Sequence, residues 1–277
     1  EFKIFNIPFK FNFINNIKNN KTFKNIESHN LRLNINNILN YNDQNINSLL
    51  EVKIINKSIQ INYIIDNNSV IFNADKFNIS GNIDLKPFYL TSNIELEQID
   101  PVKIFKNNSI LLNLLNSEIF NHQNLNINLN LYSKTIKGIN YFEDIKLKTY
   151  FEEGKILIKD STLNWKNSVN ISIDDGQLIA ENNKIILVGA FIFNFNDIDN
   201  FYKHHQVKKI YRKKIKEIRL DFVLDLNEKK FEIDNLKIDG ISTKNIDNFL
   251  ADFNLKKNDF FKKIIFKNLI KEFFAKL

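Results

Sequence analysis

Hydrophobic and polar residues alternate along most of the chain, most regularly between Leu125 and Phe195. From Leu125 to Leu131, every second residue is leucine or isoleucine and the residues between them are asparagines. Shorter runs of the same kind are Ile145–Thr149, Val169–Ile173 and Phe191–Phe195. A period of two gives a strand one apolar and one polar face, and turn signals recur about every 8–12 residues. The pattern predicts a mainly β fold built as a meander of short strands.

The same alternation extends towards the N-terminus. The runs Glu51–Ile55 and Ile59–Ile65 predict a hairpin. Because the chain has only 6 glycines and 3 prolines, asparagine and aspartate must supply most of the turns. We interpret Glu152-Glu153-Gly154 and Asp174-Asp175-Gly176 as hairpin turns of this polar kind.

Three segments depart from the period of two. Asp100-Pro101 is a helix-start signal, since aspartate caps a first turn and proline fits the first helical position, so we expect two short helices within residues 101–120. Residues 197–205 predict one or two helical turns. Asn245–Asp252 and Asp259–Lys276 have helical spacing, with phenylalanines and lysines interleaved. We expect a β domain over residues 1–240 and a C-terminal amphipathic helical segment over residues 241–277.

Composition narrows the classes of function. The 277 residues are 43% hydrophobic, which is enough for a sizeable core in one or two units. No apolar run approaches the roughly 20 residues of a transmembrane helix. The lack of cysteine excludes disulfides and thiolate metal sites. Methionine is also absent, so we expect this sequence to be an excerpt from a longer protein.

No catalytic or cofactor motif is visible. The nucleophile-elbow, P-loop and zinc-protease patterns do not occur. His204 and His205 are adjacent, and neighbouring residues on a helix point about 100° apart, so they are poorly placed to share a metal ion. The carboxylates of the predicted turns are solvated and unsuited to acid–base catalysis. We therefore expect a protein that is not an enzyme and needs no cofactor.

One cluster of basic residues exceeds the background. Between Lys203 and Arg219 there are eight basic residues and one acid, Glu217. Lysine codons are AT-rich, so an AT-rich genome could account for this charge and for the net charge of +7, and the cluster could be a solvated loop. Contact with anionic lipid head groups is the functional interpretation, with Lys208, Lys209, Arg212, Lys213 and Lys214 as the candidates. Nucleic-acid binding is disfavoured because no recognition motif accompanies the charge.

Several segments together resemble a known family. They are Gly81–Phe88 followed by Asp100-Pro101, Ile136–Leu147, Gly154–Ser161, and Asp199–Val207 with the basic residues after it. On these segments, the span from Gly81 to Gly240 resembles the C-terminal region of AsmA-like proteins of Gram-negative bacteria. The resemblance covers somewhat more than half of the chain.

The resemblance implies a fold, a place and a function. It implies a long, curved antiparallel β-meander that forms an open apolar groove, in a periplasmic protein anchored to the inner membrane outside this excerpt. Such proteins are implicated in outer-membrane biogenesis and in phospholipid transport between the two membranes. The expected partners are phospholipid, the membrane and possible envelope proteins.

An apolar groove of this kind can hold acyl chains without any catalytic residue. The candidate lining residues are those that alternate in the predicted strands: Ile127, Leu129, Ile145, Leu147, Val169, Ile171, Phe191, Phe193, Leu220, Phe222 and Leu224. The alternative is a structural or adhesive β-scaffold that binds a protein partner. A glycan-active enzyme would need clustered carboxylates and exposed aromatic residues, which the pattern does not predict.

Overall fold

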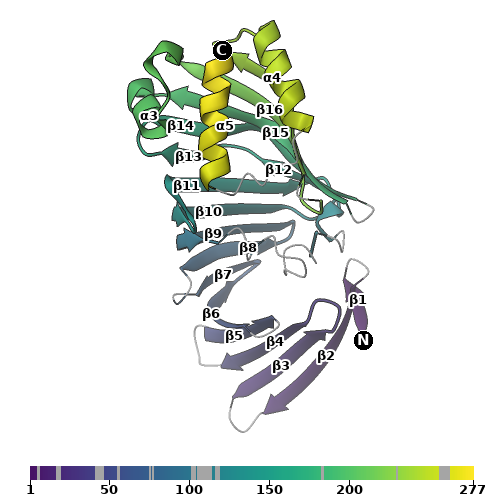
Figure 1. Ribbon diagram of the computed structural model, residues 1–277. Coiled ribbons are helices and arrows are strands. Elements are labelled where there is room, and N and C mark those ends of the chain that lie inside the picture. Colours follow the sequence, from purple (N-terminus) through teal and green to yellow (C-terminus); the bar gives the residue numbers. More distant parts are fainter. Residues whose placement is uncertain are drawn as a thin grey trace. The chain divides into compact units, whose positions relative to one another are not determined.

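The strands form one 17-stranded sheet, and most neighbouring strands are antiparallel. A computed structural model describes residues 1–4, 7–16, 20–40, 47–54, 57–74, 76, 78–100, 104, 114–115, 119–181, 184–228, 230–255 and 263–277 (Figure 1). The prediction of a mainly β fold with a long antiparallel meander is confirmed.

The strands follow one another closely along the chain. They are β1 (Phe2–Ile4), β2 (Ile7–Asn16), β3 (Lys21–Ser28), β4 (Leu33–Asn40), β5 (Asn47–Ile54), β6 (Lys57–Asp66), β7 (Ser69–Ala74), β8 (Ile79–Leu85), β9 (Phe88–Ile99), β10 (Ile127–Ile136), β11 (Ile139–Glu152), β12 (Lys155–Ile158), β13 (Ser161–Trp165), β14 (Val169–Glu181), β15 (Lys184–Phe195), β16 (Glu217–Asp225) and β17 (Lys230–Ile238). The described helices are the 3-10 turns η3 (Ile119–Asn121) and η4 (Lys209–Tyr211), and α3 (Ile198–His205), α4 (Lys244–Leu255) and α5 (Lys263–Lys276).

The hairpins set the register of the sheet. From β1 to β9 each strand pairs antiparallel with the next, and β13 to β17 do the same. In the predicted hairpin of β5 and β6, Ile54 lies opposite Lys57. The predicted turn at Glu152-Glu153-Gly154 is also confirmed, because Glu153 has a positive φ of 52° between β11 and β12.

One step in the meander is parallel. Asn130 donates to the side chain of Asn93 (3.0 Å) and Lys134 to that of Glu97 (2.9 Å), and both pairs are 37 residues apart in the sequence. A constant offset means that β9 and β10, which pair in the sheet, run in the same direction. Parallel strands need a crossover of about a dozen or more residues, and residues 100–126 supply it. Most of the predicted helices at 101–120 lie outside the described residues, although Ile104 and Leu114-Leu115 are helical.

The chain divides into two compact units. The first unit comprises residues 1–96, 101–132 and 149–156, and the second comprises residues 97–100, 133–148 and 157–277. The first unit therefore holds the hairpins from β1 to β8, and the second holds β13 to β17 with the three α-helices.

Helices cover one face of the sheet in the second unit. The predicted helix at 197–205 is α3, in which the Asp197 carboxylate accepts a hydrogen bond from the Asn200 backbone N–H (2.9 Å). Phe249 of α4 and Phe274 of α5 are buried in the same cluster as Trp165 of β13. Phe249, Phe253 and Phe274 are thus core residues, and Phe273 packs against them. None of the described helices is long and apolar enough to cross a membrane.

The sequence Asp174-Asp175-Gly176 is a bulge inside β14, so its prediction as a hairpin turn is wrong. Asp175 has a positive φ of 49°, and the pairing with β15 shifts between Asp174 and Gln177. The Arg219 guanidinium donates to the Asp174 carboxylate (2.7 Å), and a Cβ on Gly176 would lie 2.8 Å from the carbonyl oxygen of Ile158. Turns and bulges both favour glycine and residues that tolerate positive φ, and here tertiary contacts keep the strand continuous.

Candidate functional site

An apolar face extends across the first unit because the registers align apolar residues from strand to strand. Phe11 lies opposite Ile26, Ile26 opposite Ile35, Ile35 opposite Val52, and Val52 opposite Ile59. Residues opposite one another in an antiparallel pair point to the same side of the sheet. This row therefore crosses the five strands β2 to β6 on one side.

A second row continues the face through β6 to β9. Ile65 lies opposite Val70, Val70 opposite Ile83, and Ile83 opposite Leu90. We call the whole set the apolar face: Phe9, Phe11, Phe13, Ile26, Leu33, Ile35, Leu39, Leu50, Val52, Ile54, Ile59, Ile61, Tyr63, Ile65, Val70, Phe72, Ile79, Ile83, Leu90 and Ile94.

Polar residues share this side with the apolar face: Thr22, Lys24, Ser28, Asn37, Ser48, Lys57 and Ser92. Lys24 and Asn37 lie opposite each other on it, and the Asn37 amide donates to the Tyr63 hydroxyl. Most of the apolar side chains are half-buried, and Phe11 and Phe13 are about half exposed, at 46% and 54%. The face is therefore more accessible than a closed protein core.

The opposite side of the same strands carries a polar ladder beside an apolar row, in which Ile14 lies opposite Phe23 and Phe23 opposite Ile38. Asn12, Asn25, Asn36, Glu51 and Gln60 lie opposite one another in turn. The Asn25 amide donates to Asn36 (2.9 Å), and the Asn36 amide donates to the Glu51 carboxylate (3.2 Å). This bond from Asn36, with those from Lys53 and Ser58, lowers the pKa of Glu51. The polar ladder thus faces water, and on the same side Ile14 and Ile71 are 66% and 55% exposed.

The eleven groove-lining residues predicted from the sequence lie in different surroundings. Val169 and Ile171 are 1% and 3% exposed in the helix-covered cluster, and Phe191, Phe193 and Leu220 pack against it. These five side chains are covered by protein. Outside that cluster, Ile127, Ile145 and Phe222 are buried, and Leu129, Leu147 and Leu224 are half-buried.

The apolar face of the first unit therefore precedes these candidates in the chain. Sequence reasoning found the alternation in residues 9–83 but did not nominate those residues. The missing information was the register, because alternation in one strand does not tell which face of the next strand lies beside it.

The candidate basic residues lie between α3 and β16. Lys208, Lys209, Lys213 and Lys214 are exposed, and Arg212 is half-buried. They stand close together in the chain around η4, so the structure leaves this positive surface open to solvent. Arg219, by contrast, is in β16 and bonds to Asp174 and Asp221, which removes it from the cluster.

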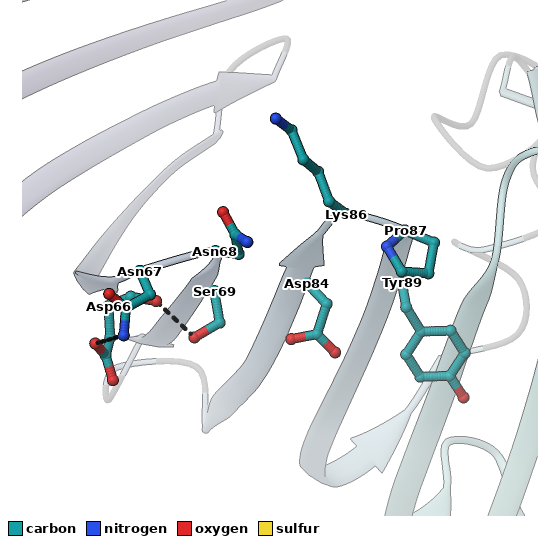
Figure 2. Close-up of a pocket in the computed structure, with 8 residues that line it drawn as sticks. All are labelled: Asp66, Asn67, Asn68, Ser69, Asp84, Lys86, Pro87 and Tyr89. Carbon is teal, nitrogen blue, oxygen red and sulfur yellow. Dashed lines mark hydrogen bonds between the residues drawn. The ribbon is translucent and has the colours of Figure 1, made fainter.

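A polar hollow of about 590 Å³ lies at the turns of the first unit (Figure 2). It is lined by Asp66, Asn67, Asn68, Ser69, Asp84, Lys86, Pro87 and Tyr89. The Ser69 hydroxyl donates to the backbone carbonyl of Asp66 (3.1 Å), and the Asn67 amide donates to the Asp66 carboxylate (3.1 Å). Figure 2 shows Lys86 extending away from both aspartates. The bonds therefore stabilise the turns, and the hollow offers no arrangement of an acid and a base around one substrate.

The two adjacent histidines are part of an aromatic cluster in the second unit. His205 is buried with its ring 5.1 Å from Trp165 and 4.6 Å from Phe201, and His204 packs edge-on to Tyr141 at 5.2 Å. Across the described ranges, no three histidine, cysteine or acidic side chains are grouped to hold a metal ion. Packing accounts for these rings.

Comparison with known proteins leaves the family open. The chain matches no family model, no curated protein and no solved structure. The resemblance to AsmA-like proteins therefore stays a prediction, and function has to be argued from the apolar face and the basic residues.

Proposed function

We propose that this chain binds the acyl chains of phospholipids on the apolar face of its first unit. In this proposal it carries or shields phospholipid in the periplasm, between the inner and outer membranes, as AsmA-like proteins are expected to do. The observation that supports it is the row Phe11–Ile26–Ile35–Val52–Ile59, which places apolar side chains side by side over five strands.

The physical argument starts from the cost of leaving such a face in water. Burying apolar surface contributes about 25 cal/mol per Å², and each methylene of a lipid chain about 0.8 kcal/mol. An acyl chain lying across the rows of the apolar face would gain this free energy without needing a directed hydrogen bond. The polar ladder on the other side would keep the complex soluble, because its amides and carboxylates face water.

Binding and transfer of lipid need no bond to be broken. In the polar hollow, the Asp66 carboxylate accepts from Asn67 and the Asp84 carboxylate accepts from Asn82. The eleven candidates of the sequence contribute unequally to this proposal. The five in or against the helix-covered cluster serve packing, so we assign acyl contact to the first unit, including the half-buried Leu129 of β10.

A pair of neighbouring substitutions tests the proposal. Ile59→Lys places a charge on the apolar face, and Gln60→Lys places the same charge on the polar ladder of the same strand. We expect native mass spectrometry to find phospholipid on the unaltered chain and on Gln60→Lys, and several-fold less on Ile59→Lys.

Circular dichroism controls for folding, since both variants must keep the β spectrum of the parent. Equal lipid loading of the two variants, or a parent chain free of lipid, would contradict the proposal. A lipid-free parent that instead retained a protein on the apolar face would support the alternative of a scaffold. The scaffold alternative predicts a β-protein with a closed core, and the second unit has such a core.

A further inference from the structure

An isoleucine projects from the basic segment between α3 and β16. Ile210, in η4, is 79% exposed, which is the highest value among the large hydrophobic residues that the structure describes. We define the basic loop as Lys208–Lys214. Four exposed lysines flank Ile210, and because single exposed apolar residues are common on protein surfaces, this one is informative only if the loop is held in its conformation.

Contacts at both ends hold the basic loop. Val207 before it and Ile215 near its end are 2% and 5% exposed and belong to the helix-covered cluster. The buried Tyr202 hydroxyl donates to the carbonyl oxygen of Lys213 (2.8 Å) and accepts from the Lys213 backbone N–H (3.2 Å). The Arg212 side chain donates to the carbonyl oxygen of Val207 (3.0 Å). The loop is thus fastened inside, while Ile210 points outward.

The charges around Ile210 remain available. Among the described residues, Lys208, Lys209 and Lys214 have no carboxylate within ion-pair distance, whereas the Lys213 ammonium group bonds to the Leu277 carbonyl oxygen. Tyr211 packs against the core and is not presented for stacking. The exposed part of the loop therefore consists of one apolar tip with cations beside it.

We propose that the basic loop docks the chain on anionic lipid surfaces, with Ile210 inserted among the head groups and the lysines on the phosphates. Lysine next to an apolar side chain is the composition that binds a membrane surface. A nucleic-acid backbone would use the charge but would leave Ile210 in water, and base stacking would need an exposed aromatic ring. This inference is independent of acyl binding by the first unit.

The lack of cysteine allows a direct test. A fluorophore that reports polarity is attached to Ile210→Cys and, as the matched control, to Ile241→Cys, another exposed isoleucine of the second unit (64%). Vesicles of phosphatidylcholine with phosphatidylglycerol are compared with vesicles of phosphatidylcholine alone. We expect a blue shift at position 210 only, with the anionic vesicles only, and its reversal by high salt.

Charge variants supply a second measurement. Lys208→Gln and Lys209→Gln should each weaken binding to the anionic vesicles about fivefold, and Ile210→Ser should weaken it several-fold, while Lys237→Gln in β17 should leave it unchanged. The proposal is overturned if position 210 keeps its emission in the presence of vesicles, or if position 241 shifts equally. It is also overturned if the chain binds single-stranded RNA but no vesicles. Lipid found on the apolar face would not support this proposal, because the apolar face and the basic loop are different surfaces.

Discussion

At the level of single residues, asparagine has two uses in this chain. Asn20, Asn67 and Asn78 adopt positive φ values near 50°, which few other non-glycine residues tolerate, and so they supply turns in a chain with few glycines. Asn25 and Asn36 instead bond side chain to side chain along the polar ladder. The sequence predicted the first use, and the second became visible only once the register placed these asparagines opposite one another.

The burial of Tyr202 makes the stability of the chain depend on pH. Burial raises the pKa of its hydroxyl above the usual value near 10. The unfolded chain then loses this proton at a lower pH than the folded chain does. Its stabilising contribution is therefore complete below about pH 10 and is lost as pH rises through the folded pKa.

We expect Tyr202→Phe to lower the free energy of unfolding by about 1 kcal/mol near neutral pH, since the Lys213 backbone loses its partner. The variant should also lose less stability than the parent between pH 9 and pH 11, roughly the range in which tyrosine ionises. Urea titrations across this range measure both effects. If the variant loses as much stability as the parent between pH 9 and pH 11, the ionisation of Tyr202 is not the cause of that loss.

At the level of elements, period-two alternation predicted the strands well, and helical spacing predicted α3 and the C-terminal helices. The bulge in β14 and the parallel step from β9 to β10 were not predicted. Residue types cannot separate a bulge from a turn, because both need the same backbone angles. Strand direction depends on where a crossover returns, and local sequence does not contain this information.

Glycine at position 81 fits the apolar face for a steric reason. It lies opposite Phe72, and a Cβ there would be 2.2 Å from the carbonyl oxygen of Thr91 and 2.4 Å from the Phe72 ring. We expect Gly81→Ala to lower the free energy of unfolding by roughly 1–3 kcal/mol, because the Phe72 ring and the neighbouring backbone must both shift.

The control for Gly81→Ala is Gly138→Ala. Gly138 has a φ of +81° and no atom within 4 Å of an added Cβ, so that variant meets only the backbone cost of about 1 kcal/mol. Denaturant unfolding compares the two variants with the parent. If Gly81→Ala is as stable as the parent, the packing of Phe72 does not require a residue without a Cβ at position 81.

At the level of the whole molecule, the two units use their apolar residues differently. The second unit covers its apolar face with its own helices through Phe249, Phe274 and their neighbours, whereas the first unit leaves apolar side chains half-buried across β2 to β9. Hydrophobic alternation alone could not separate these cases, because it predicts an apolar face without telling what covers it. This difference is why five of the eleven candidates chosen from Leu125 onward, Ile127, Ile145, Val169, Ile171 and Phe222, are buried.

The most direct test of acyl binding uses two adjacent residues on opposite sides of β4. A photoreactive benzoylphenylalanine is placed at Ile35, on the apolar face, or at Asn36, on the polar ladder, and the chain is irradiated with phospholipid vesicles. We predict a phospholipid adduct at position 35 and none at position 36. Equal labelling of both positions, or labelling of neither, would contradict the assignment of the apolar face to phospholipid.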